Sequence, residues 1–425
     1  MKTQIIERAK KIVGEITEIA SDKSISHRCV IFSLLTHSSS RIKNFLEAKD
    51  TLCSLHIAQQ LGLRVQKNED ELIFYPPEEN ILEPSDILDC GNAGTAMRLY
   101  MGMLSGIKGY FVLSGDSYLR KRPMNRVIEP LRDIGAMISS RNGGFAPISI
   151  IGKNLKGFKY ESKIPSAQVK SAMILAGLNA QSESEFREPY LSRDHTEKML
   201  QGMGASIISK EKSIFISPLK SKLDPLDLQI PSDPSSAFFF ALAAAILPES
   251  QILIKNVLLN PTRIEAFEVL RKMGAKVEYE LLEDTYEKIG HIFVAHAPLK
   301  SIEINEKIAW LIDEIPALSI AMAVAEGKSV VRQAKELRVK ECDRIKAIVH
   351  NLTAMGIQIQ EFEDGFSILG GELKRGTIES FGDHRIAMSF SIAALMCGAE
   401  IRNFSCVDVS FPSFLKVLEN HLVRN

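Results

Sequence analysis

The chain of 425 residues contains 45% hydrophobic and 24% charged residues, which excludes a disordered protein and leaves enough length for two domains or more. Its 52 basic residues balance 52 acidic ones, so no overall field attracts nucleic acid or an anionic membrane, and any preference for anions must be local. The six cysteines are scattered, with no CxxC pair and no Cys/His ligand spacing, which argues against structural zinc and indicates a reducing compartment.

The start of the chain, MKTQIIERAKKIVGEI, is too polar for a secretory signal. The longest apolar runs, near FFFALAAAIL and IPALSIAMAVA, are shorter than the roughly 18 to 20 residues that a membrane span needs. We therefore expect a cytoplasmic protein with no nucleic-acid or membrane partner.

Six segments in chain order share one pattern, a polar or glycine-containing start followed by a predicted helix rich in small apolar residues. Their starts are about 70 residues apart, with a somewhat longer step between the fourth and the fifth. They begin at Ser24, Asn92, Pro165, Asp233, Asp313 and Gly382. Such a period indicates a repeated supersecondary unit.

A second pattern recurs with the same period between these helices. The segments VIEPLRDIGAMISS, HTEKMLQGMGASIISK, AFEVLRKMGAKVEYE and KAIVHNLTAMGIQIQEF each predict an amphipathic helix, a glycine turn and an alternating strand. Each unit is therefore close to βαβαββ. Six units predict an α/β protein with two domains of three units, in which the small-residue helices are buried. The Pro-rich segment 217–234 predicts a boundary near the middle of the chain.

The starts of the six helices carry polar caps and cations. Ser24, Thr95, Ser166, Ser235, Asp313 and Asp383 lie at or near predicted N-caps, where backbone N–H groups can hold anions. Basic residues gather at the same places: Lys23, Arg28, Arg98, Lys170, His384 and Arg385, with Arg120, Lys121, Arg122 and Arg126 in SYLRKRPMNR and Arg193 and His195 in LSRDHTEK. Ordinary capping explains each start alone but explains the joint pattern poorly. We expect small, multiply charged anions to bind in a cleft between the domains.

The segment ELRVKECDRIKAIVHNL, residues 336–352, has an apolar helical stripe that includes Ile345, with charges crowded at its front. Counting back at 3.6 residues per turn places Glu341 on the inward face. If the helix already includes Lys340, this residue stands one turn from Arg344, and the two like charges repel unless an anion lies between them. A solvated helix start with internal ion pairs is the alternative interpretation.

The motifs SDKSISHR, GNAGTAMRL, LRKRPM, PSAQVKSAMILAGL, SRDHTE, DEIPALSIA, LRVKECDRI, GDHRIAM and SFPSF, in order from about Asp22 to Phe414, resemble the 5-enolpyruvylshikimate-3-phosphate synthase family of the shikimate pathway. The resemblance implies a two-domain inside-out α/β barrel of six βαβαββ repeats. It implies a discontinuous domain of residues 1–16 and 228–425, an inserted domain of residues 17–227, and hinges near Ile16 and Leu228. The implied reaction joins phosphoenolpyruvate to the 5-hydroxyl of shikimate 3-phosphate and releases phosphate, with no cofactor and no metal. We expect a monomer with these two small-molecule substrates.

The reaction needs two proton carriers. A hydroxyl attacks C2 of the enolpyruvate while C3 takes up a proton, and loss of phosphate and of a methyl proton then gives the product. By resemblance, Asp313 is the candidate base, Glu341 the candidate acid, and Lys23 assists, while His384 positions or relays, or serves as a structural cap. Burial would raise the pKa of a carboxyl such as Glu341 and neighbouring cations would lower it, so the sequence leaves its role open.

The resemblance also implies two binding sets. The set for shikimate 3-phosphate is Lys23, Ser24, Arg28, Ser166, Gln168, Arg193, Asp313 and Lys340, with Ser192 as a lesser candidate. The set for phosphoenolpyruvate is Lys23, Gly94, Arg122, Gln168, Arg344 and Arg385. Bidentate Arg suits a carboxylate and a phosphate better than Lys does.

Two departures qualify the resemblance, and Gly94 carries a separate expectation. Many relatives begin the first motif with Pro-Gly, whereas this chain has Ala20 and Ser21. Some relatives place a Lys where this chain has Val409, which leaves one fewer cation and marks a subtype. Gly94, which would be a turn glycine in a purely structural interpretation, suggests that glyphosate, a mimic of the enolpyruvate, inhibits this protein.

Two rival functions remain to be weighed. The related enolpyruvyl transferase that acts on UDP-N-acetylglucosamine carries a reactive Cys five residues before the Arg of the RP pair, where this chain has Ser117. A catalytically inactive binding or scaffold protein would have lost Asp313, Glu341 or the Arg set, all of which are present. The motifs thus favour transfer to shikimate 3-phosphate.

Overall fold

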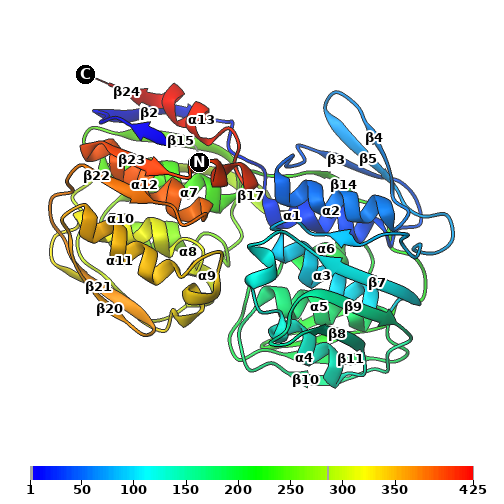
Figure 1. Cartoon of the computed structure of the whole chain (residues 1–425). Coiled ribbons are helices and arrows are strands. Elements are labelled where there is room, and N and C mark those ends of the chain that lie inside the picture. The colour runs from blue at the N-terminus through cyan, green and yellow to red at the C-terminus, as the bar shows by residue number, and fades with distance from the viewer. Residues whose placement is uncertain (1–2, 285–286, 425) are drawn as a thin grey trace. The chain divides into compact units, whose positions relative to one another are not determined.

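The computed structural model describes residues 3–284 and 287–424. Its internal contacts divide the chain into two compact units (Figure 1), a discontinuous unit of residues 1–20 and 231–425 and an inserted unit of residues 21–230. The sequence boundaries at residues 17 and 228 fall slightly earlier. Ala20 stays with the discontinuous unit because its carbonyl oxygen accepts a hydrogen bond from the Asp233 N–H at 2.8 Å. Leu228 stays with the inserted unit because it pairs with Ile42.

Every residue of the inserted unit is described, and its strands form three four-stranded sheets of one design. The orders are β14-β3-β5-β4, β6-β7-β9-β8 and β10-β11-β13-β12, with β3 (Ser40–Lys43), β4 (Arg64–Lys67), β5 (Glu71–Tyr75), β6 (Leu88–Asp89), β7 (Gly109–Ser114), β8 (Met137–Arg141), β9 (Phe145–Gly152), β10 (Lys159–Glu161), β11 (Ser184–Arg187), β12 (Ile207–Lys210), β13 (Ser213–Ile216) and β14 (Asp227–Gln229). In each sheet the first pair is parallel and the other pairs are antiparallel. Every second residue of β9 is buried, as expected for a sheet with one face on the core.

The helices of the inserted unit are α1 (Lys23–Ser33), α2 (Lys49–Gln60), α3 (Gly94–Ser105), α4 (Asn125–Asp133), α5 (Ala167–Leu178) and α6 (His195–Gly202), with a short 3-10 helix η1 (Leu119–Lys121). Nearly all of α3 and α5 is buried. The two helices approach backbone to backbone, since a Cβ added at Gly102 would lie 2.2 Å from the carbonyl oxygen of Ala172. Small residues therefore let these helices pack inside the sheets, as the sequence pattern predicts.

The described strands of the discontinuous unit also form three sheets. The orders are β16-β17-β15-β2-β24, β18-β19-β21-β20 and β1-β23-β22, with β1 (Gln4–Ile6), β2 (Lys11–Ile16), β15 (Gln251–Leu258), β16 (Lys276–Asp284), β17 (Lys288–Ala295), β18 (Glu303–Ile304), β19 (Lys328–Val331), β20 (Gln358–Phe362), β21 (Gly365–Leu369), β22 (Gly376–Glu379), β23 (Ala399–Arg402) and β24 (Leu422–Val423). β2 pairs in parallel with β15, which follows the whole inserted unit in sequence. The last sheet departs from the predicted repeat, because β1 supplies its antiparallel strand and its described part has three strands.

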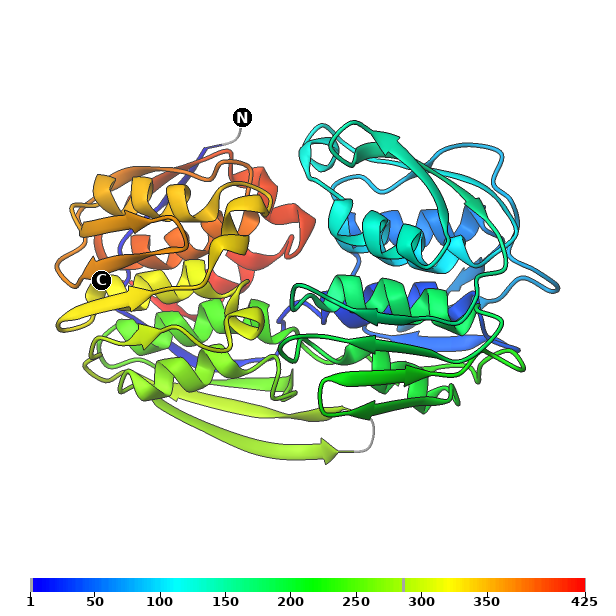
Figure 2. The same ribbon diagram turned by 90° about the horizontal axis from the view of Figure 1, so that it is seen from below.

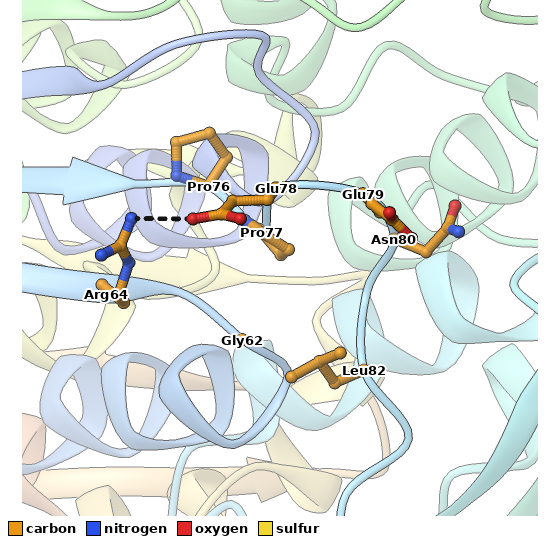
Figure 3. A pocket seen from close by; sticks show the side chains of 8 residues that line it. All are labelled: Gly62, Arg64, Pro76, Pro77, Glu78, Glu79, Asn80 and Leu82. Atoms are coloured by element: carbon orange, nitrogen blue, oxygen red, sulfur yellow. Dashed lines mark ion pairs between the residues drawn. The ribbon is translucent and has the colours of Figure 1, made fainter.

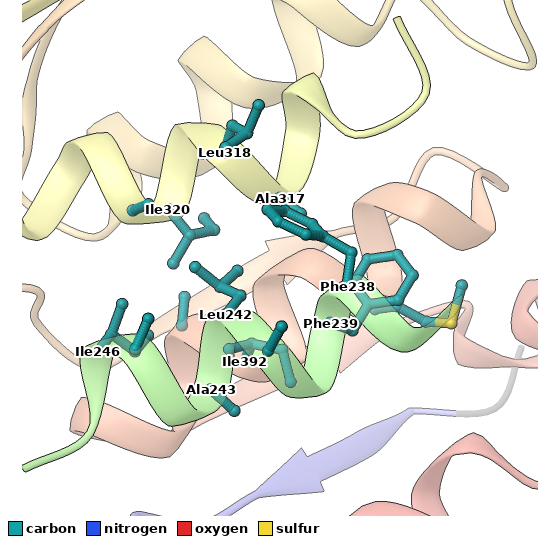
Figure 4. Packing of buried hydrophobic residues seen from close by; sticks show 14 of the residues in the cluster. Phe238, Phe239, Leu242, Ala243, Ile246, Ala317, Leu318, Ile320 and Ile392 are labelled. Carbon is teal, nitrogen blue, oxygen red and sulfur yellow. The ribbon is translucent and has the colours of Figure 1, made fainter. Parts of the chain in front are cut away.

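The helices of the discontinuous unit are α7 (Pro234–Ile246), α8 (Glu265–Lys272), α9 (Ile308–Leu311), α10 (Ile315–Val324), α11 (Arg344–Ala354), α12 (His384–Cys397) and α13 (Phe414–His421), with the 3-10 helices η2 (Lys335–Val339) and η3 (Phe404–Val409). Every residue of α7 is buried. Figure 4 shows Leu242 of α7 in the hydrophobic cluster with Ile320 of α10 and Ile392 of α12. Within each unit the small-residue helices α3, α5, α7, α10 and α12 are largely buried inside the sheets. Figure 2 shows the long strands β16 and β17 on an outer face of their unit.

The apolar stripe in residues 336–352 lies entirely in α11, but this helix begins only at Arg344, after most of the charged residues that precede the stripe. The Asp343 side chain caps α11 by accepting a hydrogen bond from the Lys346 N–H at 3.1 Å. Lys340 and Glu341 therefore precede the helix. The predicted place of Glu341 on its inward face is wrong, and the condition that the helix includes Lys340 is not met. An aspartate immediately before the first helical residue is the signal that identifies the true start.

Within the described ranges, no helix has the length and apolarity needed to cross a membrane.

Candidate active site

The candidate residues of the inserted unit begin at α1. Asp22 caps this helix, with its carboxylate accepting from the Ile25 N–H at 2.8 Å. Lys23, the first helical residue, forms an ion pair with Asp50 at the start of α2. The Asp50 side chain is buried, while Lys23 keeps 21% of its side chain exposed. Asp50 therefore holds the Lys23 ammonium in place, while part of the Lys23 side chain remains accessible to a ligand.

Arg28 is buried one turn further along α1 and connects three helices. Its Nε donates to Thr196 Oγ1 of α6 at 2.8 Å and its Nη2 donates to Ser171 Oγ of α5 at 2.9 Å. Its Nη1 donates to the Ser24 carbonyl oxygen at 2.9 Å. The structure thus brings together the starts of α1, α5 and α6, including Ser24 and Arg28 from the predicted set.

The start of α5 is joined to the start of α3 through Gln168. Its amide nitrogen donates to Thr95 Oγ1 at 2.9 Å, and its amide oxygen accepts from the guanidinium of Arg98. Ser166 caps α5 as predicted, its hydroxyl accepting from the Val169 N–H. Gln168 therefore lies where the starts of two buried helices meet.

Gly94 is the first residue of α3 and lies against two guanidinium groups. A Cβ added there would be 3.0 Å from Nη1 of Arg98 and 3.1 Å from Cζ of Arg122. Both arginines are buried. A side chain at this position would therefore push the two guanidinium groups aside by a few tenths of an ångström. Their close approach concentrates positive charge at a helix N-terminus, where anions bind well. The predicted binding sets do not include Arg98, although its place in the NAGTAMR motif could have drawn attention to it.

Ser192 and Arg193 lie in the loop before α6. The Ser192 hydroxyl donates to Glu188 Oε2 at 2.6 Å. Ser192 is buried, whereas Arg193 is partly exposed. This loop is next to Thr196, which binds Arg28.

Arg344 is the centre of a second cluster, in the discontinuous unit. It is buried, and its guanidinium contacts three carboxylates: Nε lies 2.8 Å from Asp383 Oδ2, Nη2 lies 2.7 Å from Glu341 Oε2, and Nη1 lies 3.3 Å from Asp313 Oδ1. Burial lowers the pKa of Arg344, but these carboxylates outweigh it and hold the pKa well above its ordinary value. Arg344 is thus charged, and it contacts both predicted proton carriers, Asp313 and Glu341.

Arg385 of α12 lies on the other side of Asp313. Its Nη1 donates to the Asp313 carbonyl oxygen at 3.1 Å, and its Nη2 lies 3.9 Å from the Asp313 carboxylate. Asp383 caps α12 through the Arg385 N–H at 2.8 Å, while its other oxygen holds Arg344. His384 is buried beside this cap. Asp383 is thus the residue that caps α12, and it also contacts Arg344, although the predicted binding and catalytic sets do not include it.

Lys340, which precedes α11, forms an ion pair with a residue outside this cluster. Its Nζ lies 3.0 Å from Glu336 Oε1 in the preceding 3-10 helix. Val409, the departure noted in the sequence, ends η3.

Two observations in the described part of the chain concern other kinds of site. Within residues 3–284 and 287–424, no group of three or more His, Cys, Asp or Glu side chains could hold a metal ion. Figure 3 shows a hollow of about 500 Å³ whose lining includes Arg64, Glu78 and Leu82. None of the predicted site residues lines this hollow.

Comparisons with known proteins agree over the whole length of the chain. A family model described as EPSP synthase (3-phosphoshikimate 1-carboxyvinyltransferase) matches residues 6–418. A 3-phosphoshikimate 1-carboxyvinyltransferase of Wolinella succinogenes is 57% identical over 422 residues, covering 98% of this chain and 97% of the relative. One of Nitratiruptor sp. is 56% identical over 419 residues, covering 97% and 96%. The solved structure of EPSP synthase from Acinetobacter baumannii has a TM-score of 0.87 and 37% identity, and covers 100% of this chain and 99% of that chain.

Proposed function

The chain belongs to the EPSP synthase family and transfers the enolpyruvyl group of phosphoenolpyruvate to shikimate 3-phosphate in aromatic amino acid biosynthesis, and we propose that the two side-chain clusters described above perform this transfer. Its α/β fold is that of the solved EPSP synthases. We further propose that the inserted and discontinuous units are the two domains of the enzyme, and that it is a cytoplasmic monomer.

One observation supports the assignment of the chemistry most directly. Asp313 and Glu341, the proposed base and acid, both contact the guanidinium of Arg344. A single buried cation therefore holds two carboxylates within reach of one another, at a place where an arginine fork can also bind the carboxylate or phosphate of phosphoenolpyruvate. Arg385, on the far side of Asp313, supplies a second cation to the same substrate.

The contacts of Arg344 suggest the order of events. A carboxylate in an ion pair accepts hydrogen bonds and has no proton to donate. Binding of the enolpyruvate carboxylate to Arg344 would displace Glu341, which could then take up a proton and deliver it to C3. Asp313 stays between Arg344 and Arg385 and takes the proton of the attacking hydroxyl. Lys23 stabilises the charge that develops on the transferred group.

The inserted unit supplies most of the proposed binding groups. For shikimate 3-phosphate these are Lys23, Ser24, Arg28, Ser166, Gln168 and Arg193, to which the discontinuous unit adds Asp313 and Lys340. For phosphoenolpyruvate they are Lys23, Gly94, Arg122 and Gln168, to which the discontinuous unit adds Arg344 and Arg385. His384 positions its neighbours.

The first test is release of phosphate from phosphoenolpyruvate by the purified protein. We expect release with shikimate 3-phosphate and none with UDP-N-acetylglucosamine. Release only with the sugar nucleotide would show that the acceptor is wrong. Release with neither, from folded protein, would favour the binding-protein alternative.

A further inference from the structure

Lys170 is a buried cation that the proposed reaction does not use. It lies on α5, with 2% of its side chain exposed, and its Nζ is 2.7 Å from Glu197 and 3.0 Å from Glu188. Burial lowers the pKa of Lys170, but the two carboxylates outweigh it and raise the pKa above its ordinary value. Lys170 is therefore charged. Burying ionised groups carries a desolvation penalty that apolar residues of similar volume would avoid, so this cluster is weak evidence for a gain in stability.

The cluster binds Ser192, in the loop before α6, through its N–H, its hydroxyl and its carbonyl oxygen. The Ser192 N–H donates to Glu188 Oε1 at 3.0 Å, and the Ser192 hydroxyl donates to Glu188 Oε2 at 2.6 Å. The Ser192 carbonyl oxygen accepts from Lys170 Nζ at 3.2 Å. The pair of Lys170 and Glu188 thus fixes both the backbone and the side chain of the residue next to Arg193.

The other side of Arg193 is fixed by the neighbour of Lys170 on α5. Ser171 Oγ lies 2.6 Å from Thr196 Oγ1, and both hydroxyls accept from Arg28. Two consecutive residues of one buried helix therefore bracket the segment that carries Arg193. A site that must grip a phosphoryl group gains from such rigid support, because small displacements of a binding group weaken its contacts.

We propose that Lys170 and Glu188 are positioning residues that fix Ser192 and thereby aim Arg193 at the phosphoryl group of shikimate 3-phosphate; this rests on the proposed function of Arg193. The pair touches neither substrate. Its effect reaches the substrate only through the loop.

Glu188→Met tests the proposal in the full-length enzyme. The substitution removes both acceptor oxygens but keeps the length of the side chain, and Lys170 keeps Glu197 as its counter-ion. We expect KM for shikimate 3-phosphate to rise about tenfold, whereas kcat and KM for phosphoenolpyruvate change less than about twofold. Glu188→Gln is the matched control, because its amide oxygen can still accept from the Ser192 N–H, and it should restore KM to within about twofold of the unaltered enzyme. An unchanged KM in folded Glu188→Met would overturn the proposal.

Arg193→Met separates failure of this inference from failure of the proposed function. If Arg193→Met raises KM for shikimate 3-phosphate and Glu188→Met does not, the positioning role is wrong and the binding role stands. If neither variant changes KM, the binding role of Arg193 is itself wrong. Should Glu188→Met not fold, hydrogen exchange in the unaltered protein decides: a slow Ser192 amide is expected, and exchange at the rate of an unstructured amide would refute the clamp.

Discussion

The clusters around Arg344 and Lys170 bury the same kind of charge but differ in how their carboxylates meet solvent. Two of the partners of Arg344, Asp313 and Glu341, keep 21% and 20% of their side chains exposed. The partners of Lys170, Glu188 and Glu197, keep only 1% and 5%. Arg344 can therefore exchange a partly exposed partner for a substrate anion, whereas the enclosed partners of Lys170 leave no such opening. For these two buried cations, the exposure of the counter-ions is what distinguishes a proposed binding group from a proposed support.

The largest loss of activity should follow a change to Asp313, the partly exposed partner of Arg344 that also contacts Arg385. Asp313→Asn keeps the shape of the side chain but removes the proposed base, and we expect kcat to fall about a thousandfold. Phosphate release with both substrates saturating measures this. Asp364→Asn, at a surface ion pair with Arg332, is the matched control and should leave kcat unchanged. A loss of less than about tenfold in Asp313→Asn would remove Asp313 from the role of base.

Glu341→Gln should have a smaller effect of the same sign. The variant can still accept from Arg344 but cannot deliver a proton, so we expect kcat to fall about a hundredfold with little change in either KM. The rate at which phosphoenolpyruvate is consumed in a single turnover shows whether the loss lies in the chemical step. If kcat is unchanged, another group protonates C3. Of the two partly exposed partners of Arg344, Asp313 would then take part in the reaction and Glu341 would only bind.

Gly94→Ala extends the comparison to the inserted unit, where Arg98 and Arg122 face the start of α3. The new Cβ would lie 3.0 to 3.1 Å from the two guanidinium groups, and these flexible ends can shift to make room. We expect the fold to persist and KM for phosphoenolpyruvate to rise about tenfold, since a displaced binding group loses part of its contact. Because glyphosate mimics the enolpyruvate, we expect it to inhibit the unaltered enzyme and to inhibit Gly94→Ala less. Turnover by the unaltered enzyme that is insensitive to micromolar glyphosate, with normal substrate affinity, would contradict this.

Glu197→Gln should have the smallest effect on turnover, less than about twofold, because Lys170 keeps Glu188 and the Ser192 contacts remain. Its effect on stability should depend on pH. Burial raises the pKa of Glu197 in the folded state, although Lys170 opposes this shift. The folded state then binds the proton more tightly than the unfolded state, so Glu197 costs stability that is absent below its unfolded pKa and complete above its folded pKa.

Denaturant unfolding of both proteins at several pH values checks that sign. The stability of Glu197→Gln relative to the unaltered protein should increase from acidic to neutral pH. A difference that shrinks as pH rises would show that the ion pair with Lys170 dominates over burial.

The sequence predicts the repeat, the buried helices and the gathering of cations at helix starts, because these depend on local patterns that recur along the chain. It does not predict which carboxylate meets which cation. Arg344 meets Asp383 across 39 residues and Asp313 across 31, and such pairs exist only after α10, α11 and α12 pack together. Glu341 illustrates the same limit, because helical counting placed it on α11 while the cap at Asp343 leaves it in the preceding loop. Arg98 and Lys170 were visible as cations, but only packing shows that Arg98 lies against Gly94 at the start of α3 and that Lys170 contacts the loop before α6.

The pairing of β2 with both β15 and β24 determines the order in which the chain can be completed. During synthesis β2 leaves the ribosome before either partner exists, since residues 251–258 and 422–423 come later. The inserted unit is continuous and holds its own three sheets, so it can finish folding while β2 still lacks its neighbours. The discontinuous unit, whose first strands are synthesised before the inserted unit, is therefore completed last, when β24 pairs with β2.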